Sequence, residues 1–348
     1  MESRWTRNKA RSAALQWGRA RERELTRQGP KPKQEEVVLT LEAFAPRFIE
    51  GYAEANRLKP SGIAGKKSVL KKHLEPLLGA KPLNEIDNED VQRIKSHLSG
   101  RAPKTVNNVL TVLNAMLRVA VEWGVIDEMP CRIRLFKVPR SERPFHDFAD
   151  YERLVAAARA IDPRAYLIVL LGGEAGLRCG EMMALEWTDV DLKRSPAHLV
   201  VRHSLWKGHV TSPKSGRSRR IPLTVRLAAA LEAHKHLRGR SVLCLEDGSP
   251  LSQKVVQVLV KKAARKAGLA EGGIHTLRHT FCSHLAMRAA SVRAIQELAG
   301  HQDLSTTQAY MHLSPAALED AIRLLDGDGH ALRRGEIVEA AGTPTSSC

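Results

Sequence analysis

Apolar residues recur with the spacing of an α-helix along most of this 348-residue sequence. Gly and Pro residues separate one helical run from the next. A single β-rich stretch, between Trp187 and Leu223, interrupts the pattern. The helices are expected at 40–57, 60–78, 87–99, 104–123, 149–161, 164–175, 178–186, 223–236, 252–267, 275–287, 291–299 and 305–311. The sequence therefore predicts a mainly α fold with a small antiparallel β-sheet.

The β-rich stretch predicts a hairpin. Residues 198–201 and 219–223 have the composition of strands, and they flank a turn at 212–216 that contains Ser, Pro and Gly. Lys214 lies in the middle of this turn. We therefore expect Lys214 at or near the tip of the hairpin.

The length of the chain exceeds what one ordinary hydrophobic core fills, so two domains and an arm are expected. Residues 138–147 contain two prolines among polar side chains, which is typical of a linker. The predicted division is a basic arm at 1–37, a helical domain at 38–137, a linker at 138–147, a second domain at 148–327 and a disordered tail at 328–348.

Positive charge is the strongest signal in the composition. The chain has 55 Lys and Arg against 38 Asp and Glu, which gives a net charge of +17. Such an excess indicates a polyanionic partner, usually nucleic acid, and a basic protein without one is the alternative. Arg19, Arg23 and Arg27 would form one stripe on a helix, either as a DNA-contacting arm or as a solvated face.

The composition argues against a secreted or membrane-spanning protein. The five cysteines are scattered, odd in number and never arranged as CxxC, which indicates reduced thiols in a cytoplasmic protein. No apolar stretch approaches 18 residues, and the N-terminus lacks an apolar leader segment. A cytoplasmic location without membrane contact is therefore expected.

The first candidate site residues lie at 175–185, where a turn leads into a helix. Arg178 and Glu181 are three positions apart, so both project from one face of that helix. The planar guanidinium of Arg178 can donate two hydrogen bonds to a phosphate, and Glu181 is suited to fix the turn or to orient Arg178. An ordinary surface ion pair is the alternative.

A second pair lies on the helix expected at 275–287. His275 and Arg278 are also three positions apart, so one helix brings both to the same point. Leu277 and Phe281 are expected to face the core on its other side. A zinc site at His275 and His279 is a weak alternative, because no glutamate that could serve as general base lies between them.

The third candidate segment ends one helix and begins another. Gly300 is expected to end the first helix, and Ser305 with Gln308 have the spacing of a capping box that would start the second. This arrangement would place Tyr310 on the second helix, fixed relative to His301. Only four tyrosines occur in 348 residues, so one at this position is informative, although a packing role is the alternative.

Together these segments supply the groups that phosphoryl transfer to a side chain requires. Cations and hydrogen-bond donors can surround and neutralise a phosphodiester, and a tyrosine can attack it. No carboxylate cluster for a metal accompanies them, so no metal or other cofactor is expected. The candidate catalytic residues are Arg178, Lys214, His275, Arg278, His301 and the nucleophile Tyr310, with Glu181 in support.

These motifs resemble those of the tyrosine recombinase family, the phage-type integrases. The resemblance covers residues 38–327, weakly in the helical first half and strongly in the second. It implies a helical core-binding domain and a mixed α/β catalytic domain that close on duplex DNA as a C-shaped clamp. The matching positions are 176–181, His275, Arg278, Gly300, His301 and Tyr310, with Lys214 in the place of the family's hairpin lysine.

The resemblance also implies a mechanism. Tyr310 would attack the scissile phosphate, expel a 5′-hydroxyl and leave a 3′-phosphotyrosyl enzyme. Lys214 would protonate the leaving oxygen, and His275 would accept or position the tyrosine proton. The transition state would be stabilised by Arg178, Arg278 and His301.

Several partners are implied in the same way. Strand exchange between two duplexes implies a homotetramer on two DNA sites, with an excisionase or a DNA-bending protein as candidate accessory partners. A helix expected at 314–325 would dock on the neighbouring protomer, and packing against its own domain is the alternative. A basic face of the helical domain is expected to contact DNA through Lys66, Lys67, Lys71, Lys72, Lys104 and Asn107.

Three other functions stay open at this stage. A type IB topoisomerase uses a related set of residues, but the helical first half and the motif at 176–181 favour a recombinase. A catalytically silent DNA-binding regulator is disfavoured because the set of six residues is complete. A recombinase that resolves chromosome dimers is the remaining alternative, and the basic N-terminal segment favours the integrase of a phage or another mobile element.

Overall fold

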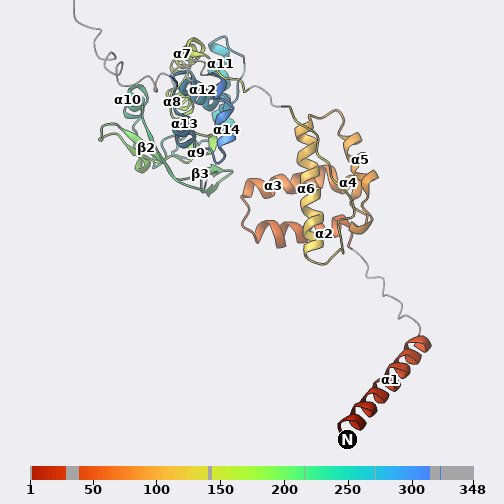
Figure 1. Ribbon diagram of the computed structural model, residues 1–348. Coiled ribbons are helices and arrows are strands. Elements are labelled where there is room, and N and C mark those ends of the chain that lie inside the picture. Colours follow the sequence, from red (N-terminus) through yellow and green to blue (C-terminus); the bar gives the residue numbers. More distant parts are fainter. Residues whose placement is uncertain are drawn as a thin grey trace, which may run out of the picture. The chain divides into compact units, whose positions relative to one another are not determined.

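The computed structural model describes residues 2–28, 39–139, 143–214, 216–270 and 272–313, together with Ile322. The chain forms two compact units, Met1–Pro139 and Arg140–Cys348 (Figure 1). The boundary falls inside the segment that the sequence indicates as a linker. Apart from Ile322, the helix expected at 314–325 and the tail expected at 328–348 lie outside the described residues.

The basic N-terminal segment forms a helix, α1 (Glu2–Gln28). Its side chains that the structure describes, between residues 11 and 27, are exposed. The Nε group of Arg23 donates to the carbonyl of Arg19 over 3.2 Å, as expected for residues four apart on one helical stripe. Across the described ranges, no helix is long and apolar enough to cross a membrane.

Helices account for the first unit beyond α1, and two of the predicted runs contain π-helical turns. The helices are α2 (Leu41–Arg47), α3 (Pro60–Val69), α4 (Glu75–Leu78), α5 (Asn88–His97) and α6 (Pro103–Glu122), with the π-helical turns η1 (Phe48–Glu54) and η2 (Leu70–Leu74) and the 3-10 turn η3 (Leu83–Glu85). The predicted run at 60–78 is thus one continuous stretch of α3, η2 and α4.

Local signals fix where these helices begin. The carboxylate of Asp87 accepts the N–H of Asp90 at 2.9 Å, and the carboxylate of Asp90 accepts the N–H of Asp87 at 3.1 Å, which caps α5. Helix α6 begins with Pro103, which has no N–H to leave unpaired in the first turn. The amphipathic face of α6 packs against α3, η1 and η2, and Phe44 and Leu113 are fully buried in the resulting core.

Four helices that pack on one another form the centre of the second unit. They are α7 (Phe148–Arg159), α8 (Pro163–Gly173), α11 (Gln253–Lys266) and α12 (Ile274–Met287). Leu277 is buried in their shared core and Phe281 in a second apolar cluster, as the sequence predicts. The shorter helices are α9 (Cys179–Met183), α10 (Val225–Ala233), α13 (Val292–Ala299) and α14 (Leu304–Gln308).

Short antiparallel strands complete the second unit, in the region where the sequence predicts them. A three-stranded sheet has the order β1-β2-β5, and β3 pairs with β4 in a separate hairpin. Leu199 of β2 lies opposite Ile221 of β5. The strands are β1 (Val190–Asp191), β2 (His198–Val201), β3 (Ser204–Trp206), β4 (His209–Thr211) and β5 (Arg219–Pro222). The predicted mainly α fold with small antiparallel sheets is confirmed.

Lys214 does not lie at the tip of a hairpin, which corrects the prediction. The tip between β3 and β4 is formed by Lys207 and Gly208, whose φ angles of 46° and 83° give the left-handed turn that suits a hairpin. Lys214 lies instead in the connection from β4 to β5, where Gly216 N–H donates to the carbonyl of Pro213 over 2.9 Å. The residue before Gly208 is Lys207 rather than the Asn or Asp that usually marks such a tip.

The connection from α13 to Tyr310 also differs from the prediction. Gly300 ends α13 with a φ of 64°, as expected. Helix α14, however, begins at Leu304 rather than at Ser305, and Asp303 at its N-cap position makes no side-chain capping hydrogen bond, so the predicted capping box is wrong. Tyr310 follows α14 rather than lying on it, and its N–H donates to the carbonyl of Thr307 over 3.0 Å. In this short helix the Gly300 turn and tertiary packing determine the start more than a cap does.

Candidate active site

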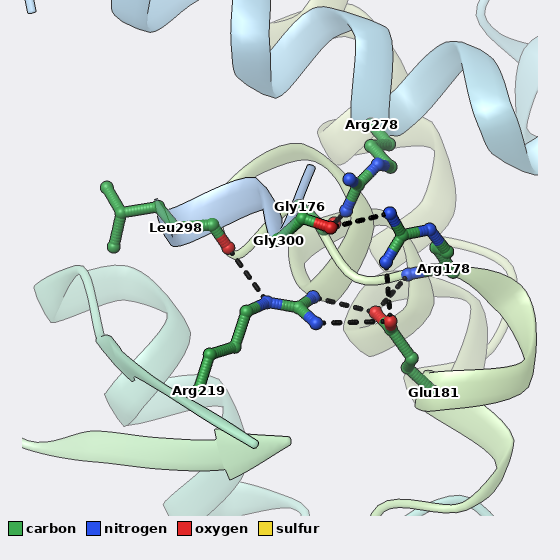
Figure 2. A network of polar contacts seen from close by, with 7 residues as sticks. All are labelled: Gly176, Arg178, Glu181, Arg219, Arg278, Leu298 and Gly300. Atoms are coloured by element: carbon green, nitrogen blue, oxygen red, sulfur yellow. Dashed lines mark hydrogen bonds and ion pairs between the residues drawn. The ribbon is translucent and has the colours of Figure 1, made fainter. Parts of the chain in front are cut away.

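Glu181 is the centre of a polar network that joins three elements (Figure 2). Its side chain is nearly inaccessible and accepts the backbone N–H of Arg178 at 2.9 Å and the guanidinium of Arg178 at 2.8 Å. The guanidinium of Arg219 on β5 donates to both carboxylate oxygens, at 3.1 and 2.7 Å. Glu181 therefore both fixes the turn and orients Arg178, the two roles that the sequence suggested.

The charge state of Glu181 follows from these contacts. Burial alone would raise its pKa, but the hydrogen bonds and charges of Arg219 and Arg178 hold the pKa at about 2. The carboxylate is therefore ionised at neutral pH. A buried anion shared by two arginines fixes the position of both cations without neutralising either completely.

Two glycine turns orient the arginines from the opposite side. Gly176 and Gly300 have φ angles of 63° and 64°, a region that favours glycine. In Figure 2 their carbonyls point to the guanidinium groups: Arg278 donates to Gly176 at 2.5 Å and Arg178 donates to Gly300 at 2.9 Å. A Cβ atom at Gly176 would lie only 2.5 Å from the ring of Phe281. These close approaches require glycine.

Arg278 carries an unsatisfied donor into the site. The residue is 5 % exposed, and burial, together with the charge of Arg178, lowers its pKa to about 10, so it stays protonated at neutral pH. Its Nη2 atom is buried and has no hydrogen-bond partner among the residues that the structure describes. A buried cationic donor without an acceptor is costly, so the site is suited to bind an anion.

Burial and the positive charges of the site lower the pKa values of the candidate histidines. Burial, followed by the charges of Arg278, Arg178 and Lys214, lowers the pKa of His275. Burial and the arginine charges lower the pKa of His301 to about 3. Both imidazoles are therefore neutral at pH 7 in the free protein. The positive charge of Lys214 is the smallest of the causes that lower the pKa of His275.

Tyr310 is held inside the protein beside these charges. It is 2 % exposed, and burial raises its pKa. The hydroxyl lies 2.5 Å from Nδ1 of His279, not against His275. The ring of His301 lies nearly parallel to that of Tyr310, with centroids 6.3 Å apart, and Nδ1 of His301 lies 2.9 Å from the hydroxyl of Thr307. The segment that contains His301 and Tyr310 thus packs against α12, the helix that carries His275 and Arg278.

Sequence reasoning missed two residues of this arrangement. Arg219 shares the inward face of β5 with Ile221, and that alternation could have indicated a buried arginine in need of an acidic partner. His279 had been considered only as a zinc ligand. Its ring contacts Tyr310, and the described part of the chain holds no group of three or more His, Cys, Asp or Glu side chains that could hold a metal.

The DNA-contacting residues predicted in the first unit have varied surroundings. Asn107 is committed to the backbone of Phe136, donating to its carbonyl at 2.9 Å and accepting its N–H at 2.8 Å. Lys67 pairs with Glu54 at 3.0 Å, and Lys66 lies over the ring of Phe48 at 5.6 Å. The side chains of Lys71, Lys72 and Lys104 are exposed. The exposed lysines are free to move toward a polyanion, whereas Asn107 serves the fold.

Concentrated positive charge around the unsatisfied guanidinium of Arg278, with a tyrosine hydroxyl held against His279 on the same helix, suits an enzyme that transfers a phosphodiester to tyrosine. Residues 145–317 match the Phage integrase family, and residues 40–99 match its N-terminal SAM-like domain. The tyrosine recombinase XerA of Thermococcus kodakarensis is 34% identical over 68% of this chain and 81% of that protein. The chain belongs to the tyrosine recombinases, site-specific enzymes that cut and rejoin DNA strands.

Solved structures share the fold. The Tn1549 transposon integrase in complex with transposon right end DNA has a TM-score of 0.69 and 18% identity, covering 83% of this chain and all of that one. A lambda integrase tetramer bound to a Holliday junction has a TM-score of 0.63 and 21% identity, covering 78% of each chain. At this level of identity the likeness concerns the fold.

Proposed function

We propose that this recombinase is the integrase of a phage or another mobile element and acts on duplex DNA in the cytoplasm. The basic helix α1 supports the mobile-element role, because it adds a cationic segment ahead of the helical domain. We divide the chain into a basic arm at 1–37, a core-binding domain at 38–137, a linker at 138–147, a catalytic domain at 148–327 and a tail at 328–348.

The observation that carries the catalytic assignment is the fixed orientation of two arginines: Glu181 and the carbonyl of Gly300 hold Arg178, and the carbonyl of Gly176 holds Arg278. Arg178 and Arg278 would bind the non-bridging oxygens of the scissile phosphate, and the unpartnered Nη2 of Arg278 would gain its missing acceptor. His301 would add a neutral N–H donor if the hydroxyl of Thr307 donates to its Nδ1, which leaves the proton on Nε2. These donors stabilise charge that develops in the transition state.

The reaction is a transesterification. The oxygen of Tyr310 attacks phosphorus, the bond from phosphorus to the 5′-oxygen breaks, and Lys214 supplies the proton for the leaving 5′-hydroxyl. A histidine takes the tyrosine proton: His275, which the family resemblance implies, or His279, which contacts the hydroxyl here. The phosphotyrosyl link retains the energy of the phosphodiester, so a 5′-hydroxyl of another strand rejoins the DNA without ATP.

Assembly follows from the need to exchange two strands. The lambda integrase tetramer on a Holliday junction supports a homotetramer of this chain on two duplex sites. The net charge of +17 supports tight contact with the phosphate backbone, through the exposed Lys71, Lys72 and Lys104 among others. An excisionase or a DNA-bending protein would determine the direction of the reaction.

The proposed nucleophile is tested with a nicked suicide duplex from the gene's own neighbourhood. The short strand released by cleavage diffuses away, so the covalent enzyme–DNA adduct accumulates. Tyr310→Phe should abolish the adduct and leave DNA affinity within about twofold, because one hydroxyl contributes little to phosphate binding. Tyr166→Phe, a partly buried tyrosine on α8, is the matched control and should retain the adduct. An adduct formed by Tyr310→Phe would refute the assignment.

Chromosome-dimer resolution is the second candidate function, supported by the 34% identity to XerA. The two functions differ in where the recombination site lies. Circular and joined products that end beside the gene itself would support a mobile element. Products that form only at one site elsewhere on the chromosome would support dimer resolution.

A further inference from the structure

The first residues of the second unit are bound to α12. His146 N–H donates to the hydroxyl of Thr280 over 3.0 Å, and Nε2 of His284 donates to the carbonyl of His146 over 3.0 Å. The side chain of His146 is buried. Residues 143–147 form the second half of the proposed linker, and these contacts attach that half to the catalytic unit. The backbone segment that carries Arg143 therefore has a defined position on the catalytic unit.

The guanidinium of Arg143 contacts the segment that carries the nucleophile at two points. Nη1 donates to the carbonyl of Thr306, on α14, over 3.0 Å. The guanidinium carbon lies 5.1 Å from the centroid of the Tyr310 ring, within the range of a cation–π contact. Arg143 thus connects α12, through the segment at 143–147, to α14 and to Tyr310.

Arg143 also influences the ionisation of the phenol. Burial raises the pKa of Tyr310 and the Cys282 thiol adds to the rise, whereas Arg143 lowers it by hydrogen bonding and by charge, more than Arg278 does. The titratable and charged groups that face Tyr310 are Arg143 before α7, Arg278, His279 and Cys282 on α12, and His301 before α14.

We propose that Arg143 is a positioning residue for the nucleophile Tyr310. It holds the turn after α14 against α12, and its positive charge favours the phenolate that attacks the phosphate. Arg143 acts through Tyr310 and needs no contact with DNA in this role. The inference rests on the proposed function, because it assigns Arg143 to the same reaction.

The test compares Arg143→Gln, which removes the charge, with Arg143→Lys, which keeps it. The full chain is incubated with the nicked suicide duplex from pH 6 to pH 9, and the rate of adduct formation is measured. Arg143→Gln should shift the rate profile by about one unit to higher pH, which is on the order of 10-fold slower at pH 7. Arg143→Lys should keep the wild-type profile. Arg153→Gln, an exposed α7 arginine, is the control.

A second measurement needs no DNA. The ultraviolet titration of Tyr310 is obtained as the difference between each protein and the same protein carrying Tyr310→Phe. Arg143→Gln should move this titration to higher pH, and Arg143→Lys should not. A shift here supports the inference even when the Gln variant loses adduct formation for other reasons.

Other outcomes overturn the inference. If Arg143→Gln forms the adduct with the wild-type pH profile and leaves the Tyr310 titration unchanged, Arg143 does not act on the nucleophile. If Arg143→Gln slows adduct formation by weakening DNA binding, as measured by fluorescence anisotropy, Arg143 is a phosphate contact. If the wild-type protein forms no adduct, the proposed function fails, whereas the Tyr310 titration still reports on Arg143.

Discussion

Glu181 shows how a single residue sets the geometry of the site. It is the one acidic partner that the structure shows for the guanidinium groups of both Arg178 and Arg219, and it also closes the turn that begins α9. Removing its charge would leave two arginines facing each other in a buried position. The cost is large because an uncompensated buried charge cannot be solvated.

Glu181→Gln should therefore destabilise the second unit by about 3 kcal/mol or more and abolish adduct formation. Glu297→Gln is the matched control, because Glu297 pairs with Arg293 at 2.7 Å on the exposed surface of α13. Its effect should stay below about 1 kcal/mol. Urea unfolding of the full chain measures both variants. Equal effects of the two substitutions would contradict the central role of Glu181.

At the scale of elements, the glycine turns bring the motifs together. Gly300 ends α13, and its carbonyl accepts from Arg178 on the other motif. A Cβ atom at this position would lie 3.0 Å from the side chain of Arg219, which holds Glu181. Gly268 follows α11 with a similar φ of 67° but has open space around it. Substitutions at Gly300 and Gly268 can therefore be compared to separate the cost of backbone strain from the effect of disturbing the site.

Gly300→Ala and Gly268→Ala should each lower the free energy of unfolding by about 1–2 kcal/mol, because a residue with a Cβ atom disfavours the left-handed backbone conformation. The decrease should be larger for Gly300→Ala, because the side chain of Arg219 must move to make room for the new Cβ atom. Gly300→Ala should also slow adduct formation. Gly268→Ala should form the adduct at the wild-type rate. Thermal unfolding and the suicide-duplex assay distinguish the two effects. A Gly300→Ala protein with normal adduct formation would show that the turn does not control the site.

The elements predicted from sequence were those with local signals. Helical periodicity indicated α5, α6 and α12, because one buried face of a helix determines that pattern. Strand-like composition on either side of turn residues indicated β2 and β5. The hairpin tip at Lys207 and Gly208 was missed because its turn lacks the usual residues. Arg143, Arg219 and His279 acquire their partners only through contacts distant in sequence, so no local pattern could reveal those partners.

At the scale of the whole molecule, histidine burial links stability to pH. The affected histidines lie in the second unit, and burial is the first cause in each case. Their pKa values are lowered at His146, His234, His275, His279, His284 and His301, to about 4 at His279 and about 3 at His301. Below pH 6.5 the unfolded chain therefore binds protons that the folded unit does not.

Stability should consequently fall as the pH is lowered from about 6.5 toward 4, and Glu181 adds a further loss below about pH 4.5 because its folded pKa is about 2. Thermal unfolding of the full chain between pH 8 and pH 4.5 measures the trend. His301→Asn removes one histidine that takes up a proton on unfolding, so the Tm of this variant should fall less steeply as the pH is lowered. A Tm that stays constant or rises from pH 7 to pH 5 would contradict this account.

The measurement that tests the central claim most directly is the chemical identification of the enzyme–DNA link. The wild-type protein is trapped on the suicide duplex and digested, and the peptide that carries the nucleotide is sequenced by mass spectrometry. The account predicts a single site, Tyr310, joined through phosphate to the 3′ end of the cleaved strand, with a free 5′-hydroxyl on the released strand. A link to any other residue, or to the 5′ end, would contradict it.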